Sequence, residues 1–329
     1  MKRRLLLPSL AAAPFAAATA ARAQPAPAGP AWSPDRPVRF VVGFAPGGST
    51  DTTARVVAQG ITAGLGQPVV VENRTGAAGN IATEHVARSA PDGHTLVVAS
   101  MGSHATNAAL YRDLPFDVAR DFVPVSLVAL SACLLVVHPS LPVRSVPDLV
   151  ARAKAEPGGL NCGIAGAGSS QHFAAALFEH RAGVRFTQVS YRGGAPAMAD
   201  LVSGRLDLVF TPVAEAIQQV RSGQVRALGT TRRERSAELP ELPAIAEALP
   251  GYAFTSWLGL FAPAGTPAPA VARIAREVAA ALRTGPARER LQQLGYEPVG
   301  GTPGEFAAFF AAELPRVAEL VRISGATVD

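Results

Sequence analysis

The residues best suited to binding a ligand form a stretch rich in glycine and hydroxyl groups, VVGFAPGGSTD (Val41–Asp51). An apolar, strand-like run precedes it and a helical pattern follows it. The backbone N–H groups of Gly47–Thr50 are therefore expected at a helix start, where they lack helical partners and carry the positive end of the helix dipole. Glycines also let a ligand approach the main chain closely. The stretch predicts an anion site, although Ser49–Asp51 could instead serve only as helix caps.

The composition of this stretch indicates which anion it would bind. A P-loop requires G-x-x-x-x-G-K-[ST], but no lysine lies nearby, and the dinucleotide pattern G-x-G-x-x-G is also missing. The carboxylate of Asp51 would disfavour a highly charged ligand such as a phosphate. An organic carboxylate has one delocalised charge and two acceptor oxygens, which suit neutral donors. We therefore expect a carboxylate ligand.

A second stretch of small residues, AGAGSSQH (Ala165–His172), is the counterpart of the first. Gly168, Ser169 and Ser170 could present N–H and hydroxyl donors at another helix start. The alternative is a secreted serine hydrolase with Ser169 or Ser170 as nucleophile and His172 as base. The pattern G-x-S-x-G is absent, however, and a residue two positions along a helix lies on a different face from Ser170. The sequence therefore favours binding, with no catalytic residue.

Two other polar groups follow expected strands. Ser100, Ser103 and His104 lie in SMGSHATN, which could also be an ordinary polar loop. Arg192 lies in the turn YRGGAPA, where it could meet a carboxylate or bond local carbonyls or Asp200. Both groups are expected at the edge of the sheet where parallel α/β proteins bind ligands.

The composition argues against several other partners. The histidines form no H-x-H or H-x-x-x-H pair and the cysteines, Cys133 and Cys162, are far apart, so neither a metal nor a cofactor is expected. Removing Lys2, Arg3, Arg4 and Arg22 with an N-terminal signal lowers the net charge from +5 to 5 − 4 = +1, which argues against nucleic acid. The cysteines could form one disulfide in an oxidising compartment, but we favour two separate buried thiols.

The N-terminus has the features of an export signal. Residues 1–23 combine a basic start, an apolar run and the cleavage pattern Ala21-Arg22-Ala23. Residues 24–34 form an extended, Pro-rich leader. No later segment is long and apolar enough to span a bilayer. We therefore expect a periplasmic protein, cleaved near Ala23.

The rest of the chain contains one α/β unit twice. In the first copy, strands are expected at 38–44, 68–73 and 94–100, and helices at 51–63, ended by Gly64, and 80–89. In the second, strands are expected at 160–166 and 186–191, a turn and strand at 203–210, and helices at 171–181 and 197–202. Continuous apolar strands that alternate with helices predict parallel sheets covered on both faces.

Two long segments, 122–140 and 256–267, could each cross between the two units. A strand at 225–231 lies between them, and helices at 268–283 and 305–322 finish the chain. The predicted fold is α/β, with two hinge-linked lobes that are each a doubly wound sheet. Lobe 1 would comprise 35–130 and 253–329, and lobe 2 would comprise 131–252. Each lobe would offer one Gly/Ser loop to the cleft between them.

Nearly the whole mature chain resembles the Bug family, the periplasmic receptors of tripartite tricarboxylate transporters. The resemblance rests on VRFVVGFAPGGSTD, SYRGGAPAMADLVSGRLDLVF, SWLGLFAPAGTP and LGYEPVGGTPGEFAAFF, among other segments. It implies a type II periplasmic-binding-protein (Venus flytrap) fold that closes on an organic carboxylate, without enzyme activity. It also implies that backbone amides and ordered waters at Phe44–Asp51 and Ala165–Ser170 seat one carboxylate, and that the GGAPA turn and the end of LDLVF shape the rest of the pocket.

One departure from the family pattern bears on the ligand. Many relatives have Asp after the strand that ends at Phe210, where this chain has Thr211 and Pro212. If that Asp holds an amino group, its loss argues against an amino acid. The sequence therefore predicts a non-amino mono- or dicarboxylate.

The expected partners are the carboxylate ligand and either the membrane subunits of a transporter or a sensor kinase, which sequence does not distinguish. The receptor is expected to be a monomer. The predicted ligand-binding residues are Phe44, Ala45, Gly47, Gly48, Ser49, Asp51, Ser100, Ser103, His104, Gly168, Ser169, Ser170, Arg192, Ala195, Thr211 and Pro212.

Overall fold

The computed structural model describes residues 32–236 and 239–327. The predicted signal peptide, 1–23, and all but the last three residues of the predicted leader lie outside this part of the chain. Within it, no helix combines the length and apolar character needed to cross a membrane.

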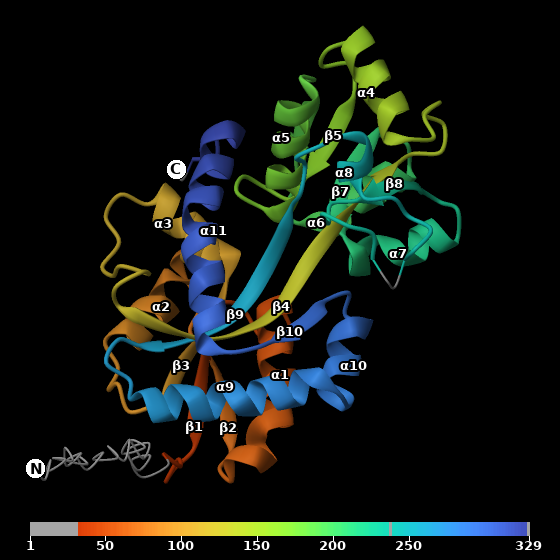
Figure 1. Ribbon diagram of the computed structural model, residues 1–329. Coiled ribbons are helices and arrows are strands. Elements are labelled where there is room, and N and C mark those ends of the chain that lie inside the picture. Colours follow the sequence, from red (N-terminus) through yellow and green to blue (C-terminus); the bar gives the residue numbers. More distant parts are fainter. Residues whose placement is uncertain (1–31, 237–238, 328–329) are drawn as a thin grey trace, which may run out of the picture. The chain divides into compact units, whose positions relative to one another are not determined.

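The described chain alternates strands and helices (Figure 1). The strands are β1 (Val38–Val42), β2 (Val69–Asn73), β3 (Thr95–Ser100), β4 (Phe122–Val137), β5 (Asn161–Ile164), β6 (Thr187–Ser190), β7 (Leu208–Pro212), β8 (Arg226–Thr230), β9 (Thr255–Pro263) and β10 (Glu297–Gly300). The helices are α1 (Ser49–Leu65), η1 (Ala77–Gly79), α2 (Asn80–Ala87), the π-helix η2 (Gly102–Thr106), α3 (Asn107–Leu110), α4 (Val146–Ala155), α5 (Ser170–Ala182), α6 (Gly194–Val202), α7 (Val213–Arg221), α8 (Ile245–Ala248), α9 (Ala268–Arg283), α10 (Pro286–Gln293) and α11 (Pro303–Ser324).

The predicted repeat is confirmed by the sheet topology. The strand order is β2-β1-β3-β9-β4-β7-β5-β6, with β8 and β10 also paired to β4. In the first unit β1 lies between β2 and β3, and in the second β5 lies between β6 and β7, with all four pairings parallel. The two Gly/Ser loops therefore follow the central strand of each unit.

The two crossing segments form the middle of the sheet and make it mixed rather than parallel. The first part of β4 pairs with β9 and β10, and its last five residues pair with β7 and β8, all antiparallel. Both strands run between the two units (Figure 1). A parallel pair needs a crossover connection, usually a helix, and strands that pass directly from one unit to the other have none, so their pairings are antiparallel. The lobe boundaries given above stay a prediction.

The first helix differs from its predicted range at both ends. It begins at Ser49 and continues through Gly64 to Leu65, with Gly66 in the left-handed conformation at its C-cap (φ 75°). A Cβ at Gly64 would collide with the carboxylate of Glu277 on α9. Gly64 therefore permits close helix packing and does not end the helix.

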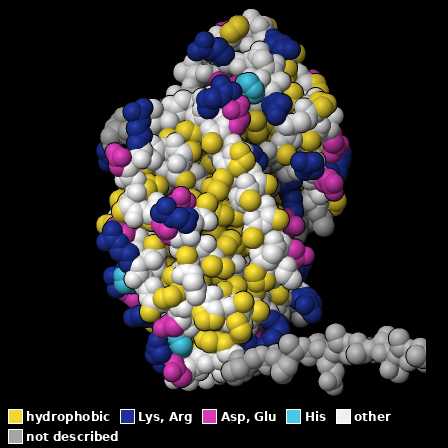
Figure 2. All heavy atoms as spheres, turned by 60° about the vertical axis from the view of Figure 1, so that its left-hand side comes forward, with side chains coloured by type: hydrophobic (Ala, Val, Ile, Leu, Met, Phe, Trp, Pro, Cys, Tyr) yellow, Lys and Arg dark blue, Asp and Glu magenta, His cyan; other side chains and the backbone are white. Residues whose placement is uncertain are grey.

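The last helix, α11, has a bulky inner side and a small outer side. Phe306 and Phe310 are buried against Trp257 and Phe261 of β9. Alanines at positions 307, 308, 311 and 312 are exposed, and apolar side chains gather on the face of the molecule shown in Figure 2. The helix also packs against the central strand β4 and against α5, the helix that follows the second Gly/Ser loop.

Candidate functional site

The loop between β1 and α1, residues 44–51 (the first loop), presents fewer free donors than predicted. Gly47 is left-handed (φ 82°), and its N–H donates to Asp51 Oδ2 at 2.8 Å. The N–H of Gly48, the N-cap, donates to the carbonyl of Ala45. Within the described residues, no acceptor is found for the N–H groups of Ser49 and Thr50. Of the four donors expected from Gly47–Thr50, only the N–H groups of Ser49 and Thr50 remain available, at the N-terminus of a 17-residue helix.

Asp51 stabilises this loop through hydrogen bonds and does not line the cavity described below. Its side chain is buried and accepts hydrogen bonds from Arg55 Nε at 3.0 Å and Asn73 Nδ2 at 2.8 Å. Asn73 also donates to the carbonyl of Phe44. Burial alone would raise the pKa of Asp51, but the hydrogen bonds from Arg55, Gly47 and Asn73 hold it below its usual value. The carboxylate stays charged and fixes the loop.

The loop between β5 and α5, residues 165–172 (the second loop), repeats this geometry. Gly168 is left-handed (φ 73°), and its N–H donates to Nδ1 of His172, four residues later, at 3.1 Å. The N-cap Ser169 has nearly the same backbone angles as Gly48 (φ −70°, ψ 161° against φ −68°, ψ 166°). The N–H groups of Ser170 and Gln171 have no acceptor among the described residues. Each loop thus presents two donors, at the first two positions of its helix. The third position differs, because the His172 N–H is bonded to the Ser169 hydroxyl whereas no acceptor is found for the Asp51 N–H among the described residues.

His172 acts in the second loop as Asp51 does in the first. Because Nδ1 accepts the Gly168 N–H, the ring proton must be on Nε2. Burial lowers the pKa of His172 and favours this neutral form. The Ser169 hydroxyl accepts from the backbone N–H of His172 and not from its ring. The described contacts therefore give the ring a structural role.

Both loops line one cavity of about 590 Å³. Its walls also include the crossing strands, through Ser131 on β4 and Ser256 and Trp257 on β9. Nine predicted site residues lie on it: Phe44, Gly47, Gly48, Ser49, Ser100, Gly168, Ser169, Ser170 and Pro212. The structure thus brings together residues more than 160 positions apart in the sequence.

The other seven predicted residues do not line the cavity. Asp51 is described above, and Ala45 and Ala195 are exposed on the first loop and in α6. Arg192 is exposed and forms no hydrogen bond or ion pair with any described residue, while Asp200 is bonded to Tyr191 and Arg205. The side chain of Ser103 is bonded to the backbone of Ser100, and Thr211 is buried with its hydroxyl donating to Glu215.

His104 lies in the core rather than at the site. It is fully buried in η2, stacked on Phe261 with ring centroids 4.7 Å apart and close to Phe122 and Phe310. Burial lowers its pKa to about 3. The predicted polar loop after β3 is a π-helix followed by α3, in which His104 faces the core while Ser100 and Gly102 line the cavity.

Sequence reasoning missed several residues that line the cavity. Gln171 and Glu215 lie on helices of the second unit, and Tyr296 follows α10, which the sequence pattern did not predict. The segments SWLGLF and LGYEPVG, which carried the family resemblance, contain Trp257 and Tyr296. The family resemblance of these two segments was the sequence evidence for the part of the cavity lined by Trp257 and Tyr296.

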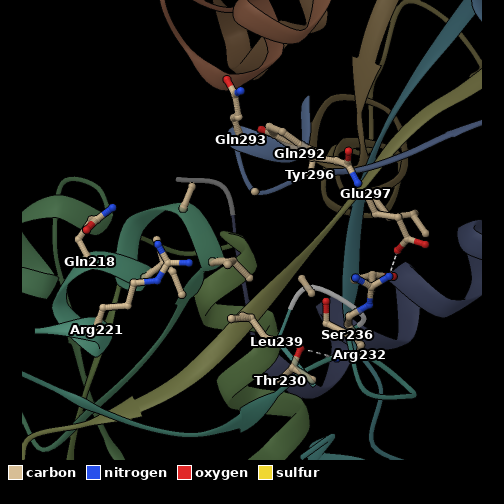
Figure 3. A pocket seen from close by; sticks show the side chains of 17 residues that line it. Gln218, Arg221, Thr230, Arg232, Ser236, Leu239, Gln292, Gln293, Tyr296 and Glu297 are labelled. Carbon is tan, nitrogen blue, oxygen red and sulfur yellow. Dashed lines mark hydrogen bonds and ion pairs between the residues drawn. The ribbon is translucent and has the colours of Figure 1, made fainter. Parts of the chain in front are cut away.

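A smaller cavity of about 290 Å³, drawn in Figure 3, shares Ala214, Gly295 and Tyr296 with the lining of the first. It lies between α7, the segment after β8 and the α10–β10 turn, and Arg232 pairs with Glu297 across it. Gly295 approaches Ala214 so closely that a Cβ at Gly295 would lie 2.9 Å from the Ala214 nitrogen. The two predicted loops do not reach this cavity, so it is not the candidate site.

The described residues contain no group of three potential metal ligands. Cys133 and Cys162 are buried free thiols, as favoured from the sequence, and burial raises the pKa of both.

Comparison with known proteins identifies the family. A profile for the tripartite tricarboxylate transporter family receptor matches residues 53–325. Protein BugT of Bordetella pertussis is 37% identical over 295 residues, which cover 89% of this chain and 90% of BugT. Among solved structures, R. palustris Rpa4515 with adipate is 38% identical, with a TM-score of 0.76 over 89% of this chain and 99% of that one. MatC from Rhodopseudomonas palustris with bound malate is 35% identical, with a TM-score of 0.71 over 88% and 99%. The resemblance is thus confirmed, and the chain belongs to the receptor family of the tripartite tricarboxylate transporters.

Proposed function

We propose that the protein is a periplasmic receptor that captures a small organic carboxylate in the cavity between its two loops. The observation that carries this proposal is the pair of matching loops, each with two available N–H groups at the start of a long helix. Two acceptor oxygens of one carboxylate fit two such pairs. Relatives crystallised with adipate and malate support the same ligand class.

Binding by both loops would stabilise a closed form. Within residues 32–236 and 239–327, the strands that run between the two units are β4 and β9, which pair at Ser131 and Ser256 beside the cavity. A ligand that contacts both loops binds the closed arrangement more tightly and so increases its population. No catalytic step is required. The predicted lobes, 35–130 with 253–329 and 131–252, are the proposed moving bodies.

Export and delivery complete the proposal. The signal peptide would be cleaved near Ala23, and the monomeric receptor would present its ligand to the membrane subunits of a tripartite tricarboxylate-type transporter. Presentation to a sensor kinase is the alternative. Deleting the membrane subunits separates the two, because uptake of the ligand is lost in the first case and retained in the second.

The test is purification of the protein from the periplasm, followed by mass spectrometry of the co-purified ligand and a thermal-shift panel of carboxylates. Ligand at about 100 times its Kd should stabilise the fold by about 2.7 kcal/mol. Absence of binding by every carboxylate would overturn the proposal. Turnover of carboxylate esters that Ser170→Ala abolishes would also overturn it, in favour of a hydrolase.

A further inference from the structure

The cavity contains a single formal charge, and it is negative. Among the described residues that line it, none is Lys, Arg, His or Asp, and Glu215 is the one acidic residue. A dicarboxylate would bring two negative charges into this setting. The helix starts compensate one carboxylate, but nothing in the described lining compensates the second.

From this we infer that Glu215 determines specificity, and that the ligand carries a positively charged nitrogen at the end away from its carboxylate. The inference rests on the proposed function, because it assumes that the two loops hold the carboxylate. An ammonium group would pair with Glu215, so a zwitterionic ligand leaves neither charge uncompensated.

One hydrogen bond and the close approach of α6 place the Glu215 carboxylate beside the second loop. Thr211, at the end of β7, donates its hydroxyl to Glu215 Oε2 at 3.0 Å. At Gly194, the first residue of α6, a Cβ would collide with this same oxygen. That Cβ would also lie 3.1 Å from Nε2 of Gln171 on α5. The Gln171 amide and the Glu215 carboxylate therefore both lie next to Gly194. The Glu215 carboxylate thus lies near Gln171 of the second loop, with Thr211 as its hydrogen-bond donor.

This arrangement bears on the ligand expected from the sequence, a non-amino mono- or dicarboxylate, which stays a prediction. That expectation depends on the absence of Asp at position 211. Glu215 supplies a carboxylate one helical turn later, and Thr211 is the residue that orients it. The cavity lining therefore contains an acidic side chain although Asp is absent at position 211.

The experiment measures calorimetric Kd values for matched ligands on the full mature protein. Succinate, glutarate and adipate are each compared with the ω-amino acid in which an ammonium replaces one carboxylate: 3-aminopropanoate, 4-aminobutanoate and 5-aminopentanoate. At the best chain length the amino acid should bind roughly tenfold more tightly or better. In Glu215→Gln, which keeps the oxygen that accepts from Thr211, this preference should disappear.

Glu241→Gln is the matched control, because it removes a negative charge from an exposed position outside the cavity. It should keep the wild-type preference. If the wild type binds a dicarboxylate as tightly as its amino counterpart, or if Glu215→Gln leaves the ratio unchanged, the inference is wrong although the receptor function stands. If neither protein binds any carboxylate, the proposed function fails and the inference fails with it.

Discussion

The first and second loops have the same backbone geometry but different chemical supports. In each, a left-handed glycine donates its N–H to the side chain four residues later, and an extended N-cap residue stands between them. The acceptor is the charged carboxylate of Asp51 in the first loop and the neutral ring of His172 in the second. The geometry, rather than the accepting group, is therefore what both loops require.

The difference predicts unequal robustness. Asp51 is bonded to Arg55 and Asn73 as well as to Gly47, so both α1 and β2 support the first loop. His172 gives the second loop one side-chain bond, through a ring whose pKa is lowered by burial. Changes to the two loops should therefore have different effects on stability and the same effect on binding.

The largest expected effect follows from replacing the glycine of the second loop. Gly168→Val puts a β-branched residue at φ 73°, a conformation that glycine adopts without strain and valine does not, so the loop must change conformation. Loss of its two N–H bonds to a carboxylate should weaken binding by roughly a hundredfold or more. Gly183→Val is the control, since it has a similar φ (62°) at the far end of α5. Equal affinities of the two variants would contradict a role of the second loop in binding.

The loops could be predicted from sequence because their signals are local. Glycine and serine before a helical pattern indicated helix starts, and the repeat indicated that the two starts belong to equivalent strands. The supports were not predictable in this way. Asn73 donates to Asp51 from β2, which is distant in the sequence. Glu215 lies at the cavity where Thr211 donates to it and where Gly194 has no side chain to occupy the space. His104 was misplaced, since it lies in a π-helix and faces the core.

A second prediction concerns the support of the first loop. Asp51→Asn replaces a buried acceptor by an amide whose NH₂ group faces the donors of Gly47 and Arg55, so stability should fall by about 2 kcal/mol in urea unfolding. Asp148→Asn is the control, because Asp148 accepts from Arg144 N–H at the same spacing but on the surface. The stability loss of Asp148→Asn should be smaller than that of Asp51→Asn. Equal losses would mean that the burial and additional bonds of Asp51 contribute nothing.

The smallest expected effect is a pH dependence that separates the supports. The pKa of His172 is lowered below 6.5 in the folded state, so its contribution is complete above pH 6.5 and decreases as the pH falls below that value. The pKa of Asp51 lies below 3.8, so its contribution decreases only below pH 3.8. From pH 7 to pH 5, hydrogen exchange of the Gly168 amide should accelerate relative to that of Gly47.

His172→Gln should remove this difference, because the amide oxygen accepts without titrating. His85 and His104 also have lowered pKa values, so both proteins will lose global stability over this range and only the difference between them is diagnostic. An identical pH response in the two proteins would show that the ring of His172 does not support the loop.

The central claim is that both loops hold one carboxylate, and a crystal structure with the tightest-binding ligand of the panel tests it most directly. The account predicts a carboxylate within hydrogen-bond distance of the Ser49 and Thr50 N–H groups on one side and the Ser170 and Gln171 N–H groups on the other, directly or through one ordered water. A carboxylate bound to one loop alone, or in the neighbouring cavity of Figure 3, would contradict it.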